Sequence, residues 1–309
     1  MSDPVIRVEN LSVTYRKRFR RAHVAAVRNL CFTVAEGEVV GFLGPNGAGK
    51  SSTIKALLGF LLPSAGTIEV LGHRAGSTQA KKDLGYLPEV ALYYPFMKAG
   101  ELLWLYGGLS GVPRGVLEPR IAHTLETVGL KGRENVLLKT FSKGMQQRLG
   151  IAQALIGDPR LLILDELSSG LDPLGRRDLR QILRSLRQEG KTIFFSSHEL
   201  SEVEMLCDRI IVINRGRKVL ESPLEDLVRP LGGFRIVFKD GGKRPDLPRE
   251  PEEQPDGTLC LRLAPEDQPH RILRDLVLSD VEIVEFHSDR GSLEDHFIRI
   301  IQDDDAHSE

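Results

Sequence analysis

Short apolar segments alternate with amphipathic segments along most of the chain. Some segments contain no polar residue, as in Leu161–Leu164, and this pattern is typical of strands buried on both faces of a parallel sheet. Others, as in Leu174–Gln188, place leucines among arginines at helical spacing. Strands that alternate with helices predict an α/β fold in which helices cover a parallel or mixed sheet.

The expected elements continue to about Arg229, so residues 1–230 are predicted to form one domain. Strands are expected at Val5–Val8, Leu11–Tyr15, Leu30–Val34, Val39–Leu43, Gly66–Leu71, Leu84–Leu87, Leu161–Leu164, Thr192–Ser196 and Ile210–Asn214. Helices are expected at Ser51–Leu62, Glu101–Leu109, Val116–Val128, Ser142–Gly157, Leu174–Gln188 and Glu199–Cys207.

The composition changes after this region. Lys243–Asp256 is rich in proline and glutamate and predicts a loop between two short strands. Residues 231–309 are therefore predicted to form a small accessory α+β domain, and the acidic tail Asp303–Asp305 is expected to be solvated and disordered. The elements expected in this domain are Phe234–Phe238, Leu259–Leu263, Pro269–Leu278, Val281–Phe286 and Gly291–Ile301.

The composition is that of a soluble globular protein. The 309 residues are 28% charged and 41% apolar with a formal net charge of −1, so no overall field favours nucleic acid. The longest apolar stretches, such as Ala56–Leu62, are too short to cross a bilayer, and no signal peptide is expected. Cys31, Cys207 and Cys260 are scattered, which fits small core residues in a reducing cytosol.

A glycine-rich segment follows the expected strand Val39–Leu43. Glycines allow several backbone N–H groups to point at phosphate oxygens, and the helix that follows adds its positive end. Lys50 is expected to reach the β- and γ-phosphates of ATP, and Ser51 to bind Mg²⁺. Alone, the motif predicts a nucleotide-binding loop and no particular activity. The segment matches G-x-x-x-x-G-K-[ST] and consists of Gly44, Pro45, Asn46, Gly47, Ala48, Gly49, Lys50 and Ser51, followed by Ser52.

Two carboxylates end the apolar strand Leu161–Leu164. Asp165 is expected to hold Mg²⁺, usually through water, and Glu166 to polarise the attacking water. His198 follows another strand of the same sheet and is expected at the same edge, where it could bond the γ-phosphate and orient the water. Such a histidine is more often a helix cap or a surface residue.

Three further segments, in family order over residues 5–230, resemble the ATP-binding subunit of an ABC transporter. Phe141–Arg148 resembles the signature motif, Asp165–Pro173 resembles the Walker B strand end with the D-loop residue Asp172, and Gly85–Glu89 resembles the Q-loop. The resemblance implies a P-loop NTPase fold with a helical subdomain at about residues 90–157. It also implies a head-to-tail homodimer with two ATP molecules at the interface.

The signature residues Ser142, Lys143, Gly144 and Met145 would then contact ATP bound to the other copy. Ser142 precedes a helix whose positive end suits a phosphate. Lys143 replaces a family glycine and Met145 the family glutamine, but Ser142 and Gly144 are retained. Glu89 stands where the family has glutamine, and we expect it to serve as an oxygen ligand of the metal.

The adenine contact has two candidates. Tyr15 is the better one for stacking on the base, and Phe19 is the alternative. The intervening segment Arg16–Arg21 is almost entirely basic. It is expected to be a solvated hairpin tip, or else a contact for anionic lipid headgroups.

The resemblance implies a cytoplasmic ATPase, peripheral on the inner face of the cell membrane, that powers permease subunits on separate chains. The motif forms and the segment from Ser292 to Phe297 resemble exporters of the ABC-2 type. Val90–Lys139 would receive the permease, with Glu101, Trp104 and Tyr106 on that surface, although Trp104 fits a core position slightly better. The alternatives are an ABC ATPase acting on ribosomes or DNA, which the neutral charge disfavours, and a small-molecule kinase.

Overall fold

The computed structural model describes residues 3–16, 23–167, 171–197, 200–228, 233–239, 245–254, 256–279, 281–289 and 293–306. It divides into two compact units. The first unit is Met1–Leu224 with Ile300–Glu309, and the second is Glu225–Arg299. In the described part of the chain, no helix is long and apolar enough to cross a membrane.

A six-stranded sheet carries the first unit. Five neighbouring strands are parallel, and β10 pairs antiparallel with β9 at one edge. The parallel strands are short and almost wholly buried, as their uniform apolar sequences predict. The order across the sheet is β10 (Arg217–Pro223), β9 (Arg209–Asn214), β3 (Val39–Leu43), β8 (Thr192–Ser197), β7 (Leu161–Leu164) and β6 (Leu84–Leu87).

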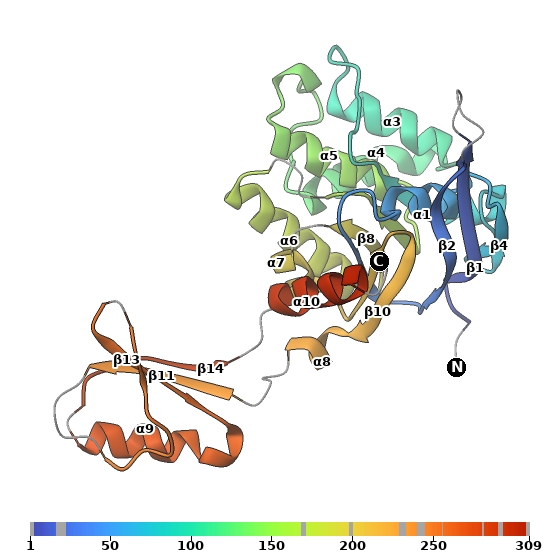
Figure 1. The fold of residues 1–309 in the computed structure, drawn as a ribbon. Coiled ribbons are helices and arrows are strands. Elements are labelled where there is room, and N and C mark those ends of the chain that lie inside the picture. The colour runs from blue at the N-terminus through green and yellow to red at the C-terminus, as the bar shows by residue number, and fades with distance from the viewer. Residues whose placement is uncertain are drawn as a thin grey trace. The chain divides into compact units, whose positions relative to one another are not determined.

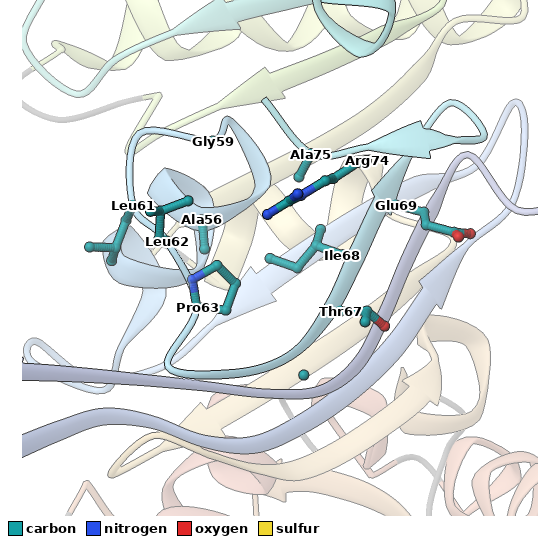
Figure 2. A pocket seen from close by; sticks show the side chains of 11 residues that line it. Ala56, Gly59, Leu61, Leu62, Pro63, Thr67, Ile68, Glu69, Arg74 and Ala75 are labelled. Carbon is teal, nitrogen blue, oxygen red and sulfur yellow. The ribbon is translucent and has the colours of Figure 1, made fainter. Parts of the chain in front are cut away.

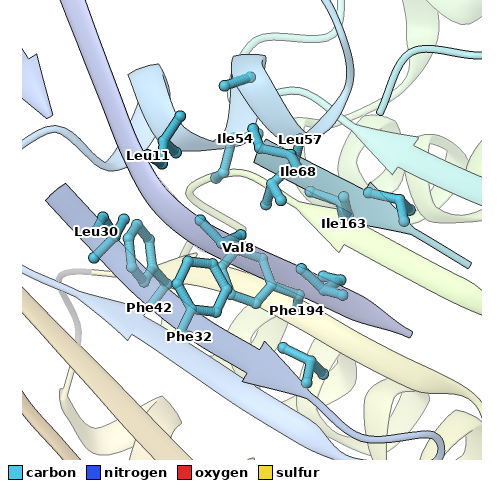
Figure 3. Close-up of a cluster of buried hydrophobic side chains, with 14 of the residues drawn as sticks. Val8, Leu11, Leu30, Phe32, Phe42, Ile54, Leu57, Ile68, Ile163 and Phe194 are labelled. Carbon is cyan, nitrogen blue, oxygen red and sulfur yellow. The ribbon is translucent and has the colours of Figure 1, made fainter. Parts of the chain in front are cut away.

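An antiparallel sheet packs against this one. Its strand order is β2 (His23–Val34), β1 (Ile6–Arg16), β4 (Ala65–Val70) and β5 (His73–Arg74). Phe32 of β2 stacks on Phe194 of β8 with ring centroids 5.7 Å apart, and Phe42 of β3 packs on both (Figure 3). Burying each such ring contributes about 1.5–3 kcal/mol, so this aromatic cluster joins the two sheets.

Helices follow the strands of the first unit. Helices α3, α4 and α5 contact one another and gather on one side of this unit (Figure 1). They lie within the stretch 90–157 that was predicted as a helical subdomain. The helices of the first unit are α1 (Lys50–Leu57), α2 (Thr78–Lys82), α3 (Ala99–Leu109), α4 (Arg114–Thr127), α5 (Lys143–Leu155), α6 (Pro173–Gln188) and α7 (Leu200–Leu206), with a short 3-10 helix at Leu138–Thr140. Helix α8 (Leu224–Val228) starts at Leu224 and continues into the segment assigned to the second unit.

Helix α5 lies unusually close to β6. A Cβ atom on Gly85 would be 2.2 Å from the carbonyl oxygen of Ala154, and one on Gly150 would be 2.5 Å from Leu87. At Gly85 the nearest atom belongs to the backbone, so only glycine permits this approach, whereas at Gly150 the side chain of Leu87 would have to shift. The helix that begins at the signature motif is therefore fixed against the strand that leads to Glu89.

The second unit contains an antiparallel sheet in the order β12 (Glu252–Glu253), β13 (Thr258–Leu263), β11 (Gly233–Lys239) and β14 (Ile283–Asp289). A 3-10 turn (Pro265–Asp267) and α9 (Pro269–Leu278) follow β13. Ile236, Phe238 and Leu261 of the sheet pack with Leu276 of α9 to form a core of its own. This is the small α+β arrangement that the sequence predicted.

The acidic tail differs from its prediction. Helix α10 runs from Leu293 to Ala306, so Asp303–Asp305 are helical and the expectation of disorder is wrong for them. The side-chain amide of Asn214 donates a hydrogen bond to Asp304 at 2.9 Å, which gives this acidic stretch an anchor in the first unit.

Every expected strand and helix has a counterpart, but several elements were not expected. Val5–Val8 and Leu11–Tyr15 are one strand, because the polar break at Asn10 is a bulge in which Asn10 takes a φ of 51°.

Strand β10 was missed. It follows a tight turn in which Arg215 and Gly216 both have positive φ, and its half-exposed residues lack an apolar run. The short β5, α2, α8 and β12 were also missed.

Candidate nucleotide-binding site

The phosphate loop connects β3 to α1. Gly47 has a φ of 81° and Gly49 a φ of 110°, a backbone region that side chains disfavour. At Gly49 space is limiting as well, since a Cβ would lie 2.5 Å from the carbonyl oxygen of Ala26. These glycines let the chain curl between Leu43 and the first turn of the helix at Lys50.

The hairpin of β9 and β10 contacts the phosphate loop and holds it by hydrogen bonds. The N–H of Gly216 donates to the carbonyl of Ala48 at 2.9 Å, and the N–H of Arg28 donates to Gly216 at 2.7 Å. A Cβ on Gly44 would lie 2.3 Å from the carbonyl oxygen of Ile213. The hairpin that sequence reasoning missed is thus part of the loop's framework.

Lys50 provides the cation of the site. Its ammonium group donates to the carbonyl of Gly44 at 2.8 Å and lies 3.5 Å from a carboxylate oxygen of Glu166. The side chains of Lys50 and Glu166 are only 6% and 12% exposed, so their charges interact with little screening. The phosphate loop and the acidic pair therefore lie next to each other in the structure, as the sequence predicted.

Asp165 is buried at the end of β7. Burial raises the pKa of its carboxyl group, and the nearby charges of Glu166 and Glu89 raise it further. The hydroxyl of Ser196 donates a hydrogen bond to Asp165 at 2.6 Å, and this bond and the charge of Lys50 act in the opposite direction. Ser196 was not predicted as a site residue. Its position near the end of β8, a strand between β3 and β7, could have identified it as a site residue from the sequence.

A cavity of about 370 Å³ opens over the loop. It brings Glu89 together with Lys50 and Glu166, as the Q-loop prediction requires. The residues that line it are Ala26, Asn46, Gly47, Gly49, Lys50, Ser51, Ser52, Glu89 and Glu166.

A second hollow, of about 420 Å³, lies between the end of α1 and β4 (Figure 2). Its wall includes Leu61, Pro63, Ile68 and Arg74, and it contains none of the predicted site residues. We therefore assign the nucleotide to the cavity at the phosphate loop.

Tyr15 lies beside the first turn of α1. Its hydroxyl is hydrogen-bonded to the hydroxyl of Ser52 at 3.1 Å, while the side chain is 40% exposed. An exposed aromatic ring next to the phosphate loop is what adenine stacking requires. The alternative candidate Phe19 lies outside the described residues, as does the basic segment from residue 17 to 21.

The signature residues lie at the start of α5. Ser142 caps this helix and accepts a hydrogen bond from the N–H of Met145 at 3.2 Å. Ser142 and Lys143 are exposed, and a Cβ on Gly144 would meet only a methyl of Leu171 at 4.0 Å. Among the described residues that line the phosphate cavity, none belongs to this motif.

The remaining predicted residues are placed as follows. Asp172 is the exposed N-cap of α6, where its carboxylate accepts from the N–H of Gly175 at 2.8 Å. Gln147 of α5 donates to the carbonyl of Leu167 at 2.7 Å, which links the signature helix to the segment after Glu166. His198 and residues 168–170 lie outside the part of the chain that the structure describes.

Known proteins share this arrangement. A family model described as ABC transporter matches residues 27–169. An uncharacterized ABC transporter ATP-binding protein of Nostoc is 38% identical over 98% of this chain and 91% of its own length. The chain belongs to the family of ABC transporter ATP-binding proteins. The Nod factor export ATP-binding protein I of Ralstonia nicotianae is 36% identical over 80% of this chain and 75% of its own.

A solved structure agrees with this assignment. The structure of an ATP-binding subunit of an ABC transporter is 31% identical, covers 74% of this chain and 93% of its own, and has a TM-score of 0.64. The predicted fold class is confirmed. This ABC cassette binds and hydrolyses ATP, so the alternative of a small-molecule kinase is wrong.

Replacing Lys50 tests the site directly. In Lys50→Ala the buried cation is lost, and charged hydrogen bonds are worth about 1.5–3 kcal/mol, so affinity for ATP is expected to fall about tenfold to a hundredfold. Titration with a fluorescent ATP analogue measures the change. Lys55→Ala is the matched control, because Lys55 is an exposed lysine of the same helix. Equal affinity of the two variants would contradict the assignment.

Proposed function

We propose that this chain is the motor of an ABC exporter, which acts as a head-to-tail homodimer on the inner face of the membrane. Permease subunits on separate chains would bind it there. The observation that carries the proposal is the cavity in which Lys50, Glu89 and Glu166 meet at the phosphate loop. Export is supported by the name of the Nod factor export relative.

Lys50 and the N–H groups of the loop would hold the triphosphate of ATP. Ser51, Glu89 and Asp165 would provide oxygen ligands for Mg²⁺, directly or through water. Mg²⁺ in such sites keeps several water molecules and takes few ligands from the protein. When bound, Mg²⁺ would neutralise part of the negative charge of the triphosphate.

Glu166 would act as the general base that polarises the attacking water. Its carboxylate lies 3.5 Å from the Lys50 ammonium, and both residues line the same cavity. Lys50 can therefore bind either this carboxylate or an incoming phosphate. His198 is proposed to bond the γ-phosphate, and Tyr15 to stack on adenine.

A second copy of the chain would complete the site. The start of α5, where Ser142 and Lys143 are exposed, is a helix N-terminus, and the N–H groups of a first helical turn suit an anion. Since the described lining of the phosphate cavity lacks these residues, the γ-phosphate of one copy would be met by Ser142–Met145 of the other. Asp172 would lie in the same interface. Loss of the γ-phosphate would then open the dimer.

The permease would dock on the segment that follows the Q-loop. Leu92 and Phe96 are 88% and 73% exposed, and Val90 and Tyr94 are exposed beside them. Trp104 of α3 is 47% exposed, so the core position that we favoured for it is wrong. It lines a hollow of about 450 Å³ with Glu101 of the same helix. Such an apolar surface suits an amphipathic helix of a membrane subunit.

The dimer predicts complementation between two inactive variants. Lys50→Ala removes the phosphate cation, and Gly144→Asp places a negative charge at the signature helix in a position with room for a side chain. Each variant alone has no complete site, but a mixed dimer has one. Mixing equal amounts is expected to restore roughly a quarter of the wild-type hydrolysis rate. Inactivity of mixed dimers, verified by cross-linking, would contradict the proposal.

If the permease docks on the exposed apolar residues after the Q-loop, replacing them with charged residues should release the chain from membranes. Leu92→Glu and Phe96→Glu are expected to lower recovery with membrane protein about tenfold when the tagged chain is purified from detergent-solubilised host membranes. ATP hydrolysis by the purified variants should stay within twofold of wild type. Leu278→Glu is the control, since Leu278 is 73% exposed in the second unit. Normal recovery of both docking variants would refute the assigned surface.

A further inference from the structure

We propose that Ser196 is a positioning residue that holds the two acidic residues of the site in a fixed relation to each other. The proposal rests on the roles given above to Asp165 and Glu166. It concerns a hydroxyl group that lies between them, which none of the sequence motifs includes.

The sheet places Ser196 at this point. Strand β8 lies between β3 and β7, with Phe42 paired to Ser196 on one side and Leu164 paired to Phe195 on the other. The residue that follows Leu164 is Asp165, so Ser196 and Asp165 are level at the carboxyl edge of the parallel strands. Ser196 is 0% exposed, so bulk water does not compete for its hydroxyl group.

One hydroxyl serves both acidic residues. The O–H of Ser196 donates to a carboxylate oxygen of Asp165 at 2.6 Å, and the hydroxyl oxygen of Ser196 accepts from the backbone N–H of Glu166 at 3.0 Å. A serine hydroxyl has one proton to donate and lone pairs to accept, so both bonds are satisfied at once. The first bond fixes which carboxylate oxygen of Asp165 faces the site. The second fixes the backbone from which the Glu166 side chain extends.

The backbone of Glu166 needs such support. Its φ is 48°, in the left-handed region, which costs a residue other than glycine about 1–2 kcal/mol. A strained conformation persists where surrounding bonds determine it. The Ser196 bond to the Glu166 N–H acts on this residue directly. Its loss would let the carboxylate move relative to Lys50 and the phosphate cavity.

The hydroxyl of Ser196 could instead only stabilise the sheet, and a matched variant separates the two roles. Thr192 lies on the same strand, is 0% exposed, and its hydroxyl accepts from the N–H of Gly37 at 2.9 Å. Thr192→Val removes a buried hydroxyl and its bond to a backbone N–H, far from the acidic pair. It measures how much stability and activity are lost when such a bond is removed where no acidic residue is involved.

The test compares Ser196→Ala, Ser196→Thr and Thr192→Val with the wild-type chain. Ser196→Ala is expected to lower kcat about tenfold to a hundredfold, because misplacing a reactive group by about 1 Å has an effect of this size. Its affinity for fluorescent ATP in EDTA should stay within about twofold, and the gain in affinity on adding Mg²⁺ should shrink. Ser196→Thr should regain most of kcat, and Thr192→Val should lose melting temperature but keep kcat.

Three results would overturn the proposal: a kcat within twofold of wild type in Ser196→Ala, an unchanged Mg²⁺ effect on its affinity, or an equal loss of kcat in Thr192→Val. If Ser196→Ala does not fold, Ser196→Cys takes its place, with an expected loss of kcat because a thiol is a weaker donor. Lys50→Ala in the same assay reports on the site itself. Hydrolysis by Lys50→Ala would refute the assigned roles, whereas inactivity of Lys50→Ala with full activity of Ser196→Ala would refute only the positioning role.

Discussion

The parallel pairing of β3, β8 and β7 is the constraint on which the nucleotide site depends. Each of these strands ends at the same edge of the sheet, and each supplies a different part there. The phosphate loop follows β3, Ser196 is the last but one residue of β8, and Asp165 follows β7. Because these strands are buried, a shift of one residue in the register of any of them would move the polar group that it supplies out of line with the other two.

Charge is concentrated where the strands end. Lys50 and Glu166 are both largely buried and lie 3.5 Å apart, and Asp165 is buried beside them. Isolated buried charges are costly, so this cluster is stabilised by its own pairing and by the carbonyl groups of the loop. A triphosphate with its cation adds charges of both signs to the same cavity. On the proposed function, the phosphate would therefore replace Glu166 as a partner of Lys50 when the site is filled.

Much of this arrangement could be predicted from sequence. Uniform apolar runs give β3, β7 and β6 with their bounds, since such runs have few alternatives within a buried sheet. The phosphate loop and the acidic pair are local motifs. Each can be recognised from residue types at fixed positions within one short segment. Glu89 was predicted as a site residue from the resemblance of Gly85–Glu89 to the Q-loop, and it lines the cavity.

Other features depend on tertiary contacts that a local pattern does not encode. Strand β10 is polar and half exposed, yet its turn at Gly216 holds the carbonyl of Ala48. Ser196 has no motif, and its role follows only from the register of β8 against β7. The helical acidic tail is held by the bond from Asn214 to Asp304, two residues between which the whole of the second unit lies in sequence.

On the proposed function, one chain provides only half of each catalytic site. Glu166→Gln should retain ATP, because the substitution keeps the shape of the side chain while removing the base. The most direct measurement is the molar mass of this variant by light scattering, with saturating ATP and Mg²⁺ and again with ADP. A dimer with ATP that dissociates with ADP is the predicted result. A monomer under both conditions would contradict the account.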